Sequence, residues 1–184
     1  MDNWIKKAQT GDQDAFRKIV EAYEKKIYNL VLQLLKKPEE AKDVTQEVFI
    51  KIYTNLSRYR AEAQFSTWAY QITYRTCMDR LRKKQKEQTL FPPQELDENQ
   101  TKIDHVSVEA RYEQRELREQ LQETLDQLPD KYRMVLILSH QQELSYQEIA
   151  DILEMPVNTV GTHLYRAKLQ LRKLLGPLRE RGMM

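Results

Sequence analysis

The stretch SYQEIADILEMPVNTVGTHLYRAKLQLRKLL, residues 145–175, decides the fold of the C-terminal half of this chain. Ser145 and Glu148 form a capping box, in which each side chain satisfies a free backbone N–H at the start of a helix. A tight break at Glu154-Met155-Pro156 separates this short helix from a longer, basic one. Such a pair is a helix-turn-helix, and its second helix is placed to enter the major groove of DNA.

The apolar residues of this stretch predict how its helices pack and which positions remain outside. We expect the contact between the two helices to be made by Ile149, Leu153, Val160 and Leu164. The outward positions of the second helix are the candidates for DNA contact: Asn158, Thr159, Thr162, His163, Tyr165, Arg166, Lys168 and Arg172. Phosphates are expected to be contacted by the helix N-terminus and by Arg166, Lys168 and Arg172. Base edges are expected to be contacted by Thr162, His163, Tyr165 and Arg166. The alternative interpretation is an ordinary helical hairpin in a bundle.

Two amphipathic helices are predicted near the N-terminus. Apolar residues recur at steps of three and four from residue 16 to residue 34, and again from residue 41 to residue 56. Pro38 lies between the two segments and suits the first turn of the second helix. A polar loop follows at residues 58–64.

The second of these helices has an outward face with its own character. Asp43, Gln46, Glu47 and Ile50 fall at steps of three or four, which places an acidic, polar patch on one surface. Such a face suits a basic partner helix. From the periodicity alone, a merely solvated face is the simpler interpretation.

A third helix is expected after the polar loop, capped by Ser66 and carrying Trp68, Ile72 and Leu81 inward. This segment interleaves aromatic and basic side chains: Tyr59, Phe65, Tyr70 and Tyr74 with Arg60, Arg75, Arg80, Arg82 and Lys83. Aromatic faces stack on unpaired bases, at about 1–3 kcal/mol each, while cations follow the backbone. The segment therefore favours a surface for an opened DNA strand. Alternatively, several of the aromatics are core, as we expect for Trp68.

The predicted fold class is all-α, with two small helical domains. Residues 88–104 contain paired prolines and several acids without sustained periodicity, which is typical of a flexible linker. Helical signal resumes near Glu109 and continues to Leu128. We therefore expect domains at residues 1–86 and 109–184, joined by a linker at residues 87–108.

Composition excludes several classes of protein. The 184 residues carry 30 basic and 28 acidic side chains, yet two basic clusters flank an acidic middle, which favours binding to a polyanion at two places. The single cysteine, Cys77, excludes an intrachain disulfide. No apolar run is long enough to cross a membrane, and the N-terminal residues MDNWIKKAQTGD lack the apolar core of a signal peptide. A soluble, cytoplasmic protein without membrane insertion is expected.

Catalytic chemistry is not expected either. The three histidines lie far apart without ligands at metal-binding spacing, and the four glycines form no phosphate-binding loop. The expectation is therefore no enzyme activity, no metal and no cofactor.

Several ordered motifs carry a resemblance to a known family. Residues 128–175 pair Leu128-Pro129 with Glu148-Ile149-Ala150, Thr159-Val160 and Arg166-Ala167, as in region four of bacterial sigma factors. Asp43-Val44, Gln46-Glu47 and Phe49 are similar to the sigma region two segment that binds RNA polymerase. With region two, a short linker and region four only, the chain resembles the extracytoplasmic-function group.

The resemblance implies a subunit that recruits core RNA polymerase to promoters, opens the minus-ten element and reads the minus-thirty-five element. It implies that the clamp helices of the largest polymerase subunit contact Asp43, Gln46, Glu47, Phe49 and Ile50, and that the β subunit flap is a further contact. It assigns the minus-ten strand to Tyr59, Arg60, Phe65, Tyr74, Arg75, Asp79, Arg80, Arg82 and Lys83. Double-stranded and single-stranded promoter DNA are then ligands. Relatives are commonly held inactive by an anti-sigma factor, often anchored in a membrane, so such a partner is implied.

Three residues depart from the family's pattern. Gly161 and His163 stand where relatives usually carry basic residues, and Arg75 stands where many carry asparagine. Gly161 also weakens its helix by about 1 kcal/mol relative to alanine. We therefore expect weak DNA binding by the second domain alone.

A stand-alone regulator is the competing interpretation. It would pair the helix-turn-helix with a dimerisation or sensing domain and would bind palindromic DNA as a homodimer without polymerase. The outward acidic patch and the aromatic, basic segment have no role in such a regulator. The sequence therefore favours the sigma factor.

Overall fold

The computed structural model describes residues 2–90, 123–140 and 142–180, and within these ranges it contains helices and no strand. Most of the predicted linker and the helix start near Glu109 lie outside the described residues. The chain divides into two compact units, residues 1–92 with 150–154, and residues 93–149 with 155–184. None of the described helices is long and apolar enough to span a membrane.

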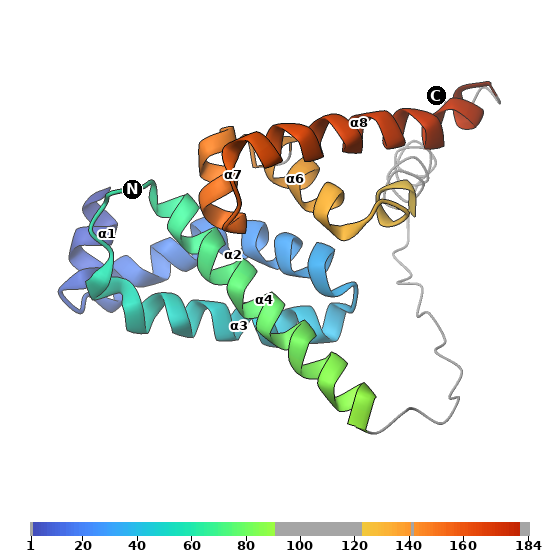
Figure 1. Ribbon diagram of the computed structural model, residues 1–184. Coiled ribbons are helices and arrows are strands. Elements are labelled where there is room, and N and C mark those ends of the chain that lie inside the picture. Colours follow the sequence, from blue (N-terminus) through green and yellow to red (C-terminus); the bar gives the residue numbers. More distant parts are fainter. Residues whose placement is uncertain (1, 91–122, 141, 181–184) are drawn as a thin grey trace, which may run out of the picture. The chain divides into compact units, whose positions relative to one another are not determined.

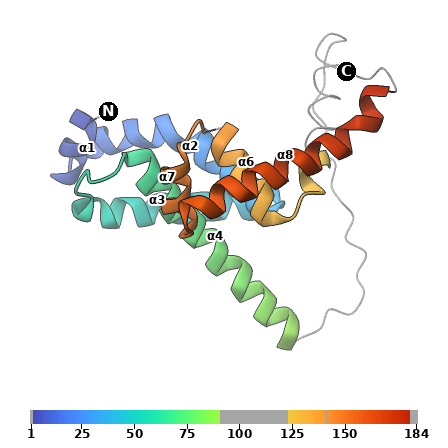
Figure 2. The ribbon, with the colours of Figure 1, turned by 45° about the horizontal axis from the view of Figure 1, so that its top comes forward.

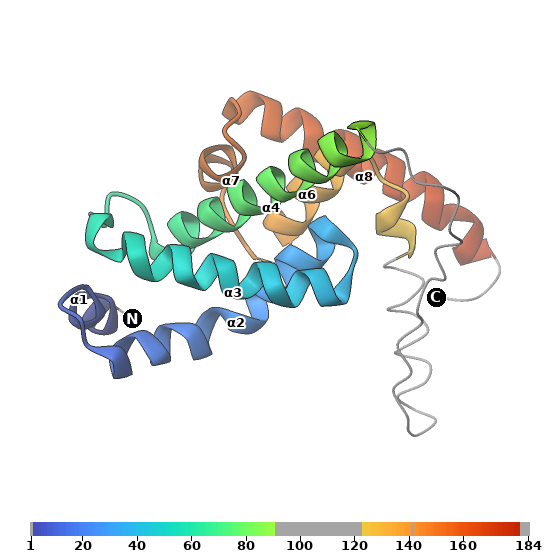
Figure 3. The same ribbon diagram turned by 90° about the horizontal axis from the view of Figure 1, so that it is seen from below.

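The first unit is built from four α-helices and one short 3-10 turn. They are α1 (Asp2–Gln9), α2 (Gln13–Leu35), α3 (Pro38–Asn55), the 3-10 turn η1 (Leu56–Arg58) and α4 (Phe65–Leu90). Helices α2 and α3 lie side by side, and α4 packs against both of them (Figures 1 and 3). Helix α1 packs against the start of α2 and against η1. Because α4 continues to Leu90, its end lies beyond Lys86, where the first domain was expected to end.

Local sequence explains where α2 and α3 begin and end. The side chain of Asp12 accepts a hydrogen bond of 2.9 Å from the Ala15 N–H and so caps α2. Lys36 ends that helix in the left-handed conformation, with φ of 59°. Pro38 then occupies the first turn of α3, as predicted, where its missing N–H costs nothing.

The apolar stripes predicted for α2 and α3 are confirmed as the core of the first unit. Ile19, Ile27 and Val31 of α2 and Val48 and Ile52 of α3 have no exposed surface. Burying each side chain of this size contributes about 1.5–3 kcal/mol, so this seam accounts for much of the stability of the unit.

The face predicted for α4 is wrong. The helix buries Ala69, Tyr70, Thr73 and Cys77, while Trp68, Ile72 and Leu81 are only half-buried. Small and hydroxyl-bearing residues of α4 face the core where it packs against two helices. The buried hydroxyls of Thr73 and Thr76 bond within the helix, to the carbonyls of Ala69 and Ile72, each at 2.8 Å. Ser66 is not the cap either, since α4 already begins at Phe65.

The second unit contains α6 (Asp130–His140) and α8 (Val157–Glu180), which pack against each other (Figure 2). The short helix α7 (Tyr146–Leu153) precedes α8 in the chain. The predicted capping box is confirmed: the Glu148 carboxylate accepts from the Ser145 N–H at 2.9 Å, and the Ser145 hydroxyl accepts from the Glu148 N–H at 3.3 Å. Glu154 has φ of 54°, which is the break predicted after this helix.

Helix α6 buries the continuous run from Tyr132 to Leu138, and one of these buried residues was not anticipated. Arg133 is 1% exposed, although arginine is rarely found in a core unless it is paired. Its guanidinium donates to Asp126 at 3.3 Å and to Asp130 at 2.8 Å. The two carboxylates thus neutralise a charge inside the second unit.

Candidate functional surfaces

The outward face of α3 is as polar as the sequence predicted. We call Asp43, Gln46, Glu47 and Ile50 the α3 patch. Asp43 and Gln46 are exposed, Glu47 is half-buried, and the Ile50 side chain is 63% exposed. Phe49 does not belong to this surface, because its ring is 9% exposed and lies in the core. We therefore correct its role: Phe49 supports the patch from below instead of presenting its ring to a partner.

An apolar side chain that the sequence analysis missed extends the α3 patch. Tyr53 is 45% exposed and lies one helical turn after Ile50. Its ring meets the Phe16 ring of α2 edge-on, with centroids 4.8 Å apart. The spacing of three residues between Ile50 and Tyr53 could have placed Tyr53 on the same face of the helix. Two adjacent exposed apolar side chains beside acidic groups are typical of a protein-binding surface.

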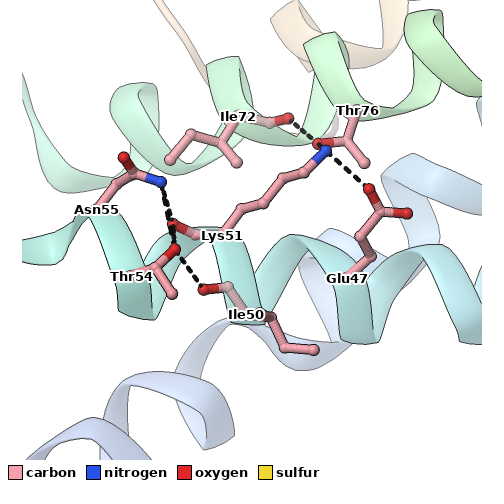
Figure 4. Close-up of polar contacts among 7 residues, drawn as sticks. All are labelled: Glu47, Ile50, Lys51, Thr54, Asn55, Ile72 and Thr76. Atoms are coloured by element: carbon pink, nitrogen blue, oxygen red, sulfur yellow. Dashed lines mark hydrogen bonds and ion pairs between the residues drawn. The ribbon is translucent and has the colours of Figure 1, made fainter.

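A polar network connects the α3 patch to α4 (Figure 4). The Lys51 ammonium lies 2.7 Å from the Glu47 carboxylate and donates to the Thr76 hydroxyl at 3.3 Å. The Thr76 hydroxyl in turn donates to the Ile72 carbonyl at 2.8 Å, and the Asn55 amide donates to the Lys51 carbonyl at 2.8 Å. The Lys51–Thr76 bond joins α3 to α4, and the other contacts position its two partners within their own helices.

The polar loop between η1 and α4 presents an aromatic ring. We call residues 59–64 the Tyr59 loop. The Tyr59 hydroxyl donates to the Ala63 carbonyl at 2.8 Å, and Ala61 adopts the left-handed conformation with φ of 57°. The Tyr59 ring is half-buried, which raises the pKa of its hydroxyl above the usual value. Arg58, Arg60 and Glu62 complete a small open pocket of about 190 Å³ beside this ring.

Phe65 supports this loop from below. Its ring is 5% exposed and meets the rings of Tyr59 and Tyr23 edge-on, at 5.4 Å and 5.3 Å between centroids. The ring of Phe65 therefore packs beneath Tyr59, and the DNA contact that the resemblance implies for Phe65 stays a prediction. The expectation that Tyr59 contacts an opened DNA strand stays a prediction.

A second pocket lies between α3 and α4. Its volume is about 280 Å³, and it is lined by Lys51, Asn55, Arg58, Trp68, Ile72, Arg75, Thr76 and Asp79. Trp68 and Ile72, expected in the core, instead form its apolar wall, while Lys51, Arg58 and Arg75 bring positive charge. An apolar wall with cations at the rim can hold an unpaired base and its phosphate. We call this hollow the α3–α4 pocket.

The remaining basic residues of α4 are partly paired with acids. Arg80 and Lys84 both reach Glu40 of α3, at 3.1 Å and 3.6 Å. Arg82 lies 3.4 Å from Asp79, and Lys83 lies 3.9 Å from Glu87. The Arg82–Asp79 and Lys83–Glu87 pairs are exposed and contribute little, so these two cations can exchange a carboxylate for a phosphate, whereas Glu40 is only 17% exposed. Tyr74, also predicted on this surface, is half-buried.

Helix α8 presents the residues predicted for duplex DNA. Asn158, Thr162, Arg166, Lys168 and Arg172 are exposed, and Tyr165 is 69% exposed. Thr159 is half-buried beside them. The buried face of the same helix carries Val160, Leu164 and Ala167, as predicted. The outward stripe of α8 is therefore continuous from its first turn.

His163 is held against α6 rather than pointing freely outward. Its ring meets the Tyr132 ring edge-on at 5.3 Å between centroids, and its buried Nδ1 has no hydrogen-bond partner among the described residues. Burial lowers the pKa of the imidazole, and the nearby Lys131 and Arg166 lower it further. The imidazole is therefore neutral at pH 7 and does not replace the basic residue that relatives usually carry there.

Metal binding and thiol chemistry are not supported by the part of the chain that the structure describes. They hold no group of three histidine, cysteine or acidic side chains that could bind a metal ion. Cys77 has no exposed surface, and burial raises the pKa of its thiol to about 12. A thiol of that kind is not a nucleophile at neutral pH.

Comparisons with known proteins agree with this geometry. The family described as Sigma-70 region 2 matches residues 19–87, and the family described as Sigma-70, region 4 matches residues 118–171. The ECF RNA polymerase sigma factor SigW of Bacillus subtilis is 40% identical over 179 residues, covering 95% of this chain and 96% of its own. The RNA polymerase sigma-H factor of Pseudomonas aeruginosa is 32% identical, with 95% and 93% coverage.

A solved structure has a similar fold. It is the sigma factor RpoE of Bartonella quintana in complex with the anti-sigma factor NepR. The match has a TM-score of 0.70 at 20% identity, and it covers 88% of this chain and 96% of the other.

Proposed function

This chain belongs to the extracytoplasmic-function sigma factors of the sigma-70 family, and we propose that its α3 patch docks on core RNA polymerase while three other surfaces engage promoter DNA. As a sigma factor it directs promoter-specific initiation of transcription. Matches to both region 2 and region 4 disfavour a stand-alone dimeric regulator, which would need only the helix-turn-helix. The proposal assigns no catalytic step to the chain itself. We place its action in the cytoplasm, where bacterial polymerase works.

One observation carries the proposal. Helix α3 presents an acidic and apolar patch outward, and through Lys51 and Asn55 the same helix lines the pocket that it shares with α4. A polymerase contact and a DNA contact therefore lie on one rigid helix. Docking through the patch would set the position of the pocket relative to the polymerase, which is the task of a promoter-recognition subunit.

The α3 patch is suited to a basic helical partner. Asp43 and Glu47 supply acceptors, and Ile50 and Tyr53 supply apolar area at the centre of the contact. We assign this partner to the clamp helices of the largest polymerase subunit, and we assign the β subunit flap to the second domain. The domains that we propose are residues 1–86 and 109–184, with the linker between them.

The Tyr59 loop and the α3–α4 pocket are assigned to the minus-ten element. Flipping a base out of a duplex costs a few kcal/mol, and stacking on an aromatic ring returns about 1–3 kcal/mol. Tyr59 offers such a ring, and Arg60 and Arg75 offer charge for the displaced strand. The other proposed contacts of this surface are Tyr74, Asp79, Arg80, Arg82 and Lys83.

Helix α8 is assigned to the minus-thirty-five element. Arg166, Lys168 and Arg172 are placed for phosphates, and Thr162 and Tyr165 for base edges. The neutral His163 packs against the Tyr132 ring and is not assigned a phosphate contact. Phosphate contacts on this helix are therefore fewer than in relatives with two more cations.

Replacing Gly161 with alanine tests whether glycine is needed in this helix. A Cβ at residue 161 would lie 3.7 Å from Tyr146 Cε2, which is ordinary contact, so no steric reason requires glycine. Gly161→Ala is expected to stabilise the second unit by about 0.5–1 kcal/mol, because glycine loses more backbone entropy in a helix. Thermal unfolding of the two proteins measures this, and a lower melting temperature for Gly161→Ala would contradict it.

The variant Gly161→Arg tests the missing phosphate contact. Polymerase carrying it should bind promoter DNA more tightly than polymerase with Gly161→Ala, and the slope of log affinity against log salt should steepen by about 0.9. A salt titration of DNA binding by both holoenzymes measures the slope. Equal slopes would show that residue 161 does not face a phosphate.

An anti-sigma factor is the further partner that we propose. The similar fold of RpoE, whose structure is a complex with the anti-sigma factor NepR, supports a chain of this architecture being held by such a protein. The exposed Ile50 and Tyr53 would be covered in that complex, because they are the surface that polymerase needs. We expect the partner in some hosts to be anchored in a membrane, while this chain itself would not insert.

The proposed function is tested by transcription of a genomic fragment pool with purified bacterial core polymerase, with and without this protein. We expect new start sites that share two spaced sequence elements. Tight binding to palindromic fragments without polymerase, together with no new start sites, would instead establish the dimeric regulator.

A further inference from the structure

Helix α1 reaches the Tyr59 loop through one side chain. The Gln9 amide nitrogen donates to the Leu56 carbonyl at 3.0 Å and to the Tyr59 carbonyl at 2.8 Å. Leu56 and Tyr59 lie 47 and 50 positions after Gln9, so these bonds connect distant parts of the sequence. Gln9 is half-buried, so water competes with these bonds less than at the open surface.

The two carbonyls lie where the backbone changes direction. Leu56 begins η1, and its carbonyl also accepts from the Tyr59 N–H at 3.1 Å. Tyr59 ends η1 in the extended conformation, with ψ of 116°, and is the first residue of the Tyr59 loop. The Gln9 amide therefore adds a second donor to the Leu56 carbonyl and bonds the carbonyl of Tyr59, the residue that follows η1.

The Tyr59 ring packs against Phe65 and Trp68 of α4, while the backbone of the loop is held by local contacts. The Tyr59 hydroxyl bonds to Ala63 within the same loop, and Ala61 carries the strain of a left-handed conformation. Such strain persists only where surrounding structure over-determines the backbone. Gln9 supplies part of that constraint, because it holds the loop's first carbonyl from another helix.

Gln9 is itself well anchored. Ile5 and Ala8 bury α1 against its neighbours, at 4% and 5% exposure. The turn that follows is closed by Thr10 N–H to the Lys7 carbonyl and Gly11 N–H to the Ala8 carbonyl, both at 3.0 Å. Gly11 has φ of 94°, which favours glycine and directs the chain into α2. The amide therefore projects from a fixed point.

We propose that Gln9 is a positioning residue for promoter opening. Its amide fixes the carbonyls of Leu56 and Tyr59, so that the Tyr59 ring is preorganised to stack on an unpaired base. Gln9 does not contact the DNA. The inference rests on the proposed role of the Tyr59 loop at the minus-ten element. It gives α1 a task that neither the sequence motifs nor the pocket residues indicate.

Two substitutions separate the amide's bonds from its packing. Gln9→Met keeps a flexible side chain of similar length in the helix but has no donor. Gln9→Lys restores donors that can reach a carbonyl, because its ammonium carries three N–H groups. A residue that only fills space would be replaced well by methionine, whereas a positioning residue would be rescued by lysine.

The first experiment measures the loop without polymerase or DNA. Hydrogen exchange of the full-length protein is followed in the peptide that spans residues 57–64. We expect exchange about tenfold faster in Gln9→Met, because each of the two lost hydrogen bonds changes an equilibrium constant about threefold, and near-normal exchange in Gln9→Lys. Unchanged exchange in Gln9→Met would overturn the inference.

The second experiment measures promoter opening by holoenzyme assembled from purified bacterial core polymerase. The template is a promoter selected from the genomic fragment pool, with 2-aminopurine in the non-template strand of the minus-ten element. We expect Gln9→Met to open it about tenfold more slowly, Gln9→Lys to recover most of the rate, and core binding to be unchanged in both.

Tyr59→Ala, measured in parallel, separates the inference from the function on which it rests. Slow opening by Tyr59→Ala with normal opening by Gln9→Met would overturn the inference and leave the proposed function standing. Normal opening by both variants would overturn the assignment of the Tyr59 loop and the inference with it. Slow opening by both, with rescue by lysine, supports the role of Gln9.

Discussion

Replacing Glu47 with lysine is expected to abolish binding of core polymerase while the first unit stays folded. Glu47 lies in the α3 patch, where it forms an exposed ion pair with Lys51. Losing such a pair costs about 0.3–0.5 kcal/mol, and a like-charged neighbour at this spacing costs a similar amount. Placing a cation against a basic partner helix costs several kcal/mol, so affinity for core polymerase should fall by about a hundredfold or more.

The control for this variant is Glu87→Lys. Glu87 pairs with Lys83 at the same spacing of four residues, on α4 and outside the α3 patch, so the change of charge is identical. Binding of both variants to fluorescently labelled core polymerase, without DNA, gives the comparison. Circular dichroism should show the same helix content and melting temperature within a few degrees. Full polymerase binding by Glu47→Lys would remove the assignment of the α3 patch.

Removing both carboxylates around Arg133 is expected to destabilise the second unit by about 3 kcal/mol. The double variant Asp126→Ala with Asp130→Ala leaves a guanidinium that is 1% exposed without its counter-charges. An unpaired buried charge is costly because neither water nor a partner replaces the lost interaction. For a unit of this size, the melting temperature should fall by about 10 °C or more.

Replacing Arg133 itself should cost far less. Asp130 is 80% exposed and Asp126 is 36% exposed, so both carboxylates become hydrated when the guanidinium is removed. Arg133→Met fills a similar volume with apolar atoms, and such exchanges of buried ion pairs are often neutral or stabilising. Differential scanning calorimetry of the variants measures the contrast. Equal destabilisation by Arg133→Met and by the double variant would show that packing, not charge, dominates at this position.

The sequence predicted the parts of the fold that depend on local chemistry. The stripes of α2 and α3 were correct because the apolar positions of each helix recur with the helical period and are the ones that the structure buries. Pro38, the Ser145–Glu148 capping box and the break at Glu154 were correct because each acts within a few residues. The outward residues of α8 were predicted by the same reasoning, since they are the positions left over when the buried face is assigned.

The errors lie where several elements meet. Helix α4 contacts both α2 and α3, so its buried face carries threonine, alanine and cysteine, while Trp68 lines a pocket. Phe49 and Phe65 were expected at surfaces, but their rings are buried under the α3 patch and the Tyr59 loop. Motif position alone did not distinguish a residue that touches a partner from one that supports it.

The sequence by itself determined the helix boundaries set by caps and breaks, the stripes of helices with a single packed face, and the kinds of surface that the chain carries. Only the tertiary structure decided how Gln9 reaches the Tyr59 loop, how Lys51 joins Glu47 to Thr76, and how Arg133 becomes a buried cation. The physical reason is the distance along the sequence over which each interaction acts. Helix propensity and capping act over three or four residues, whereas these contacts join different helices or depend on how closely neighbouring elements cover a side chain.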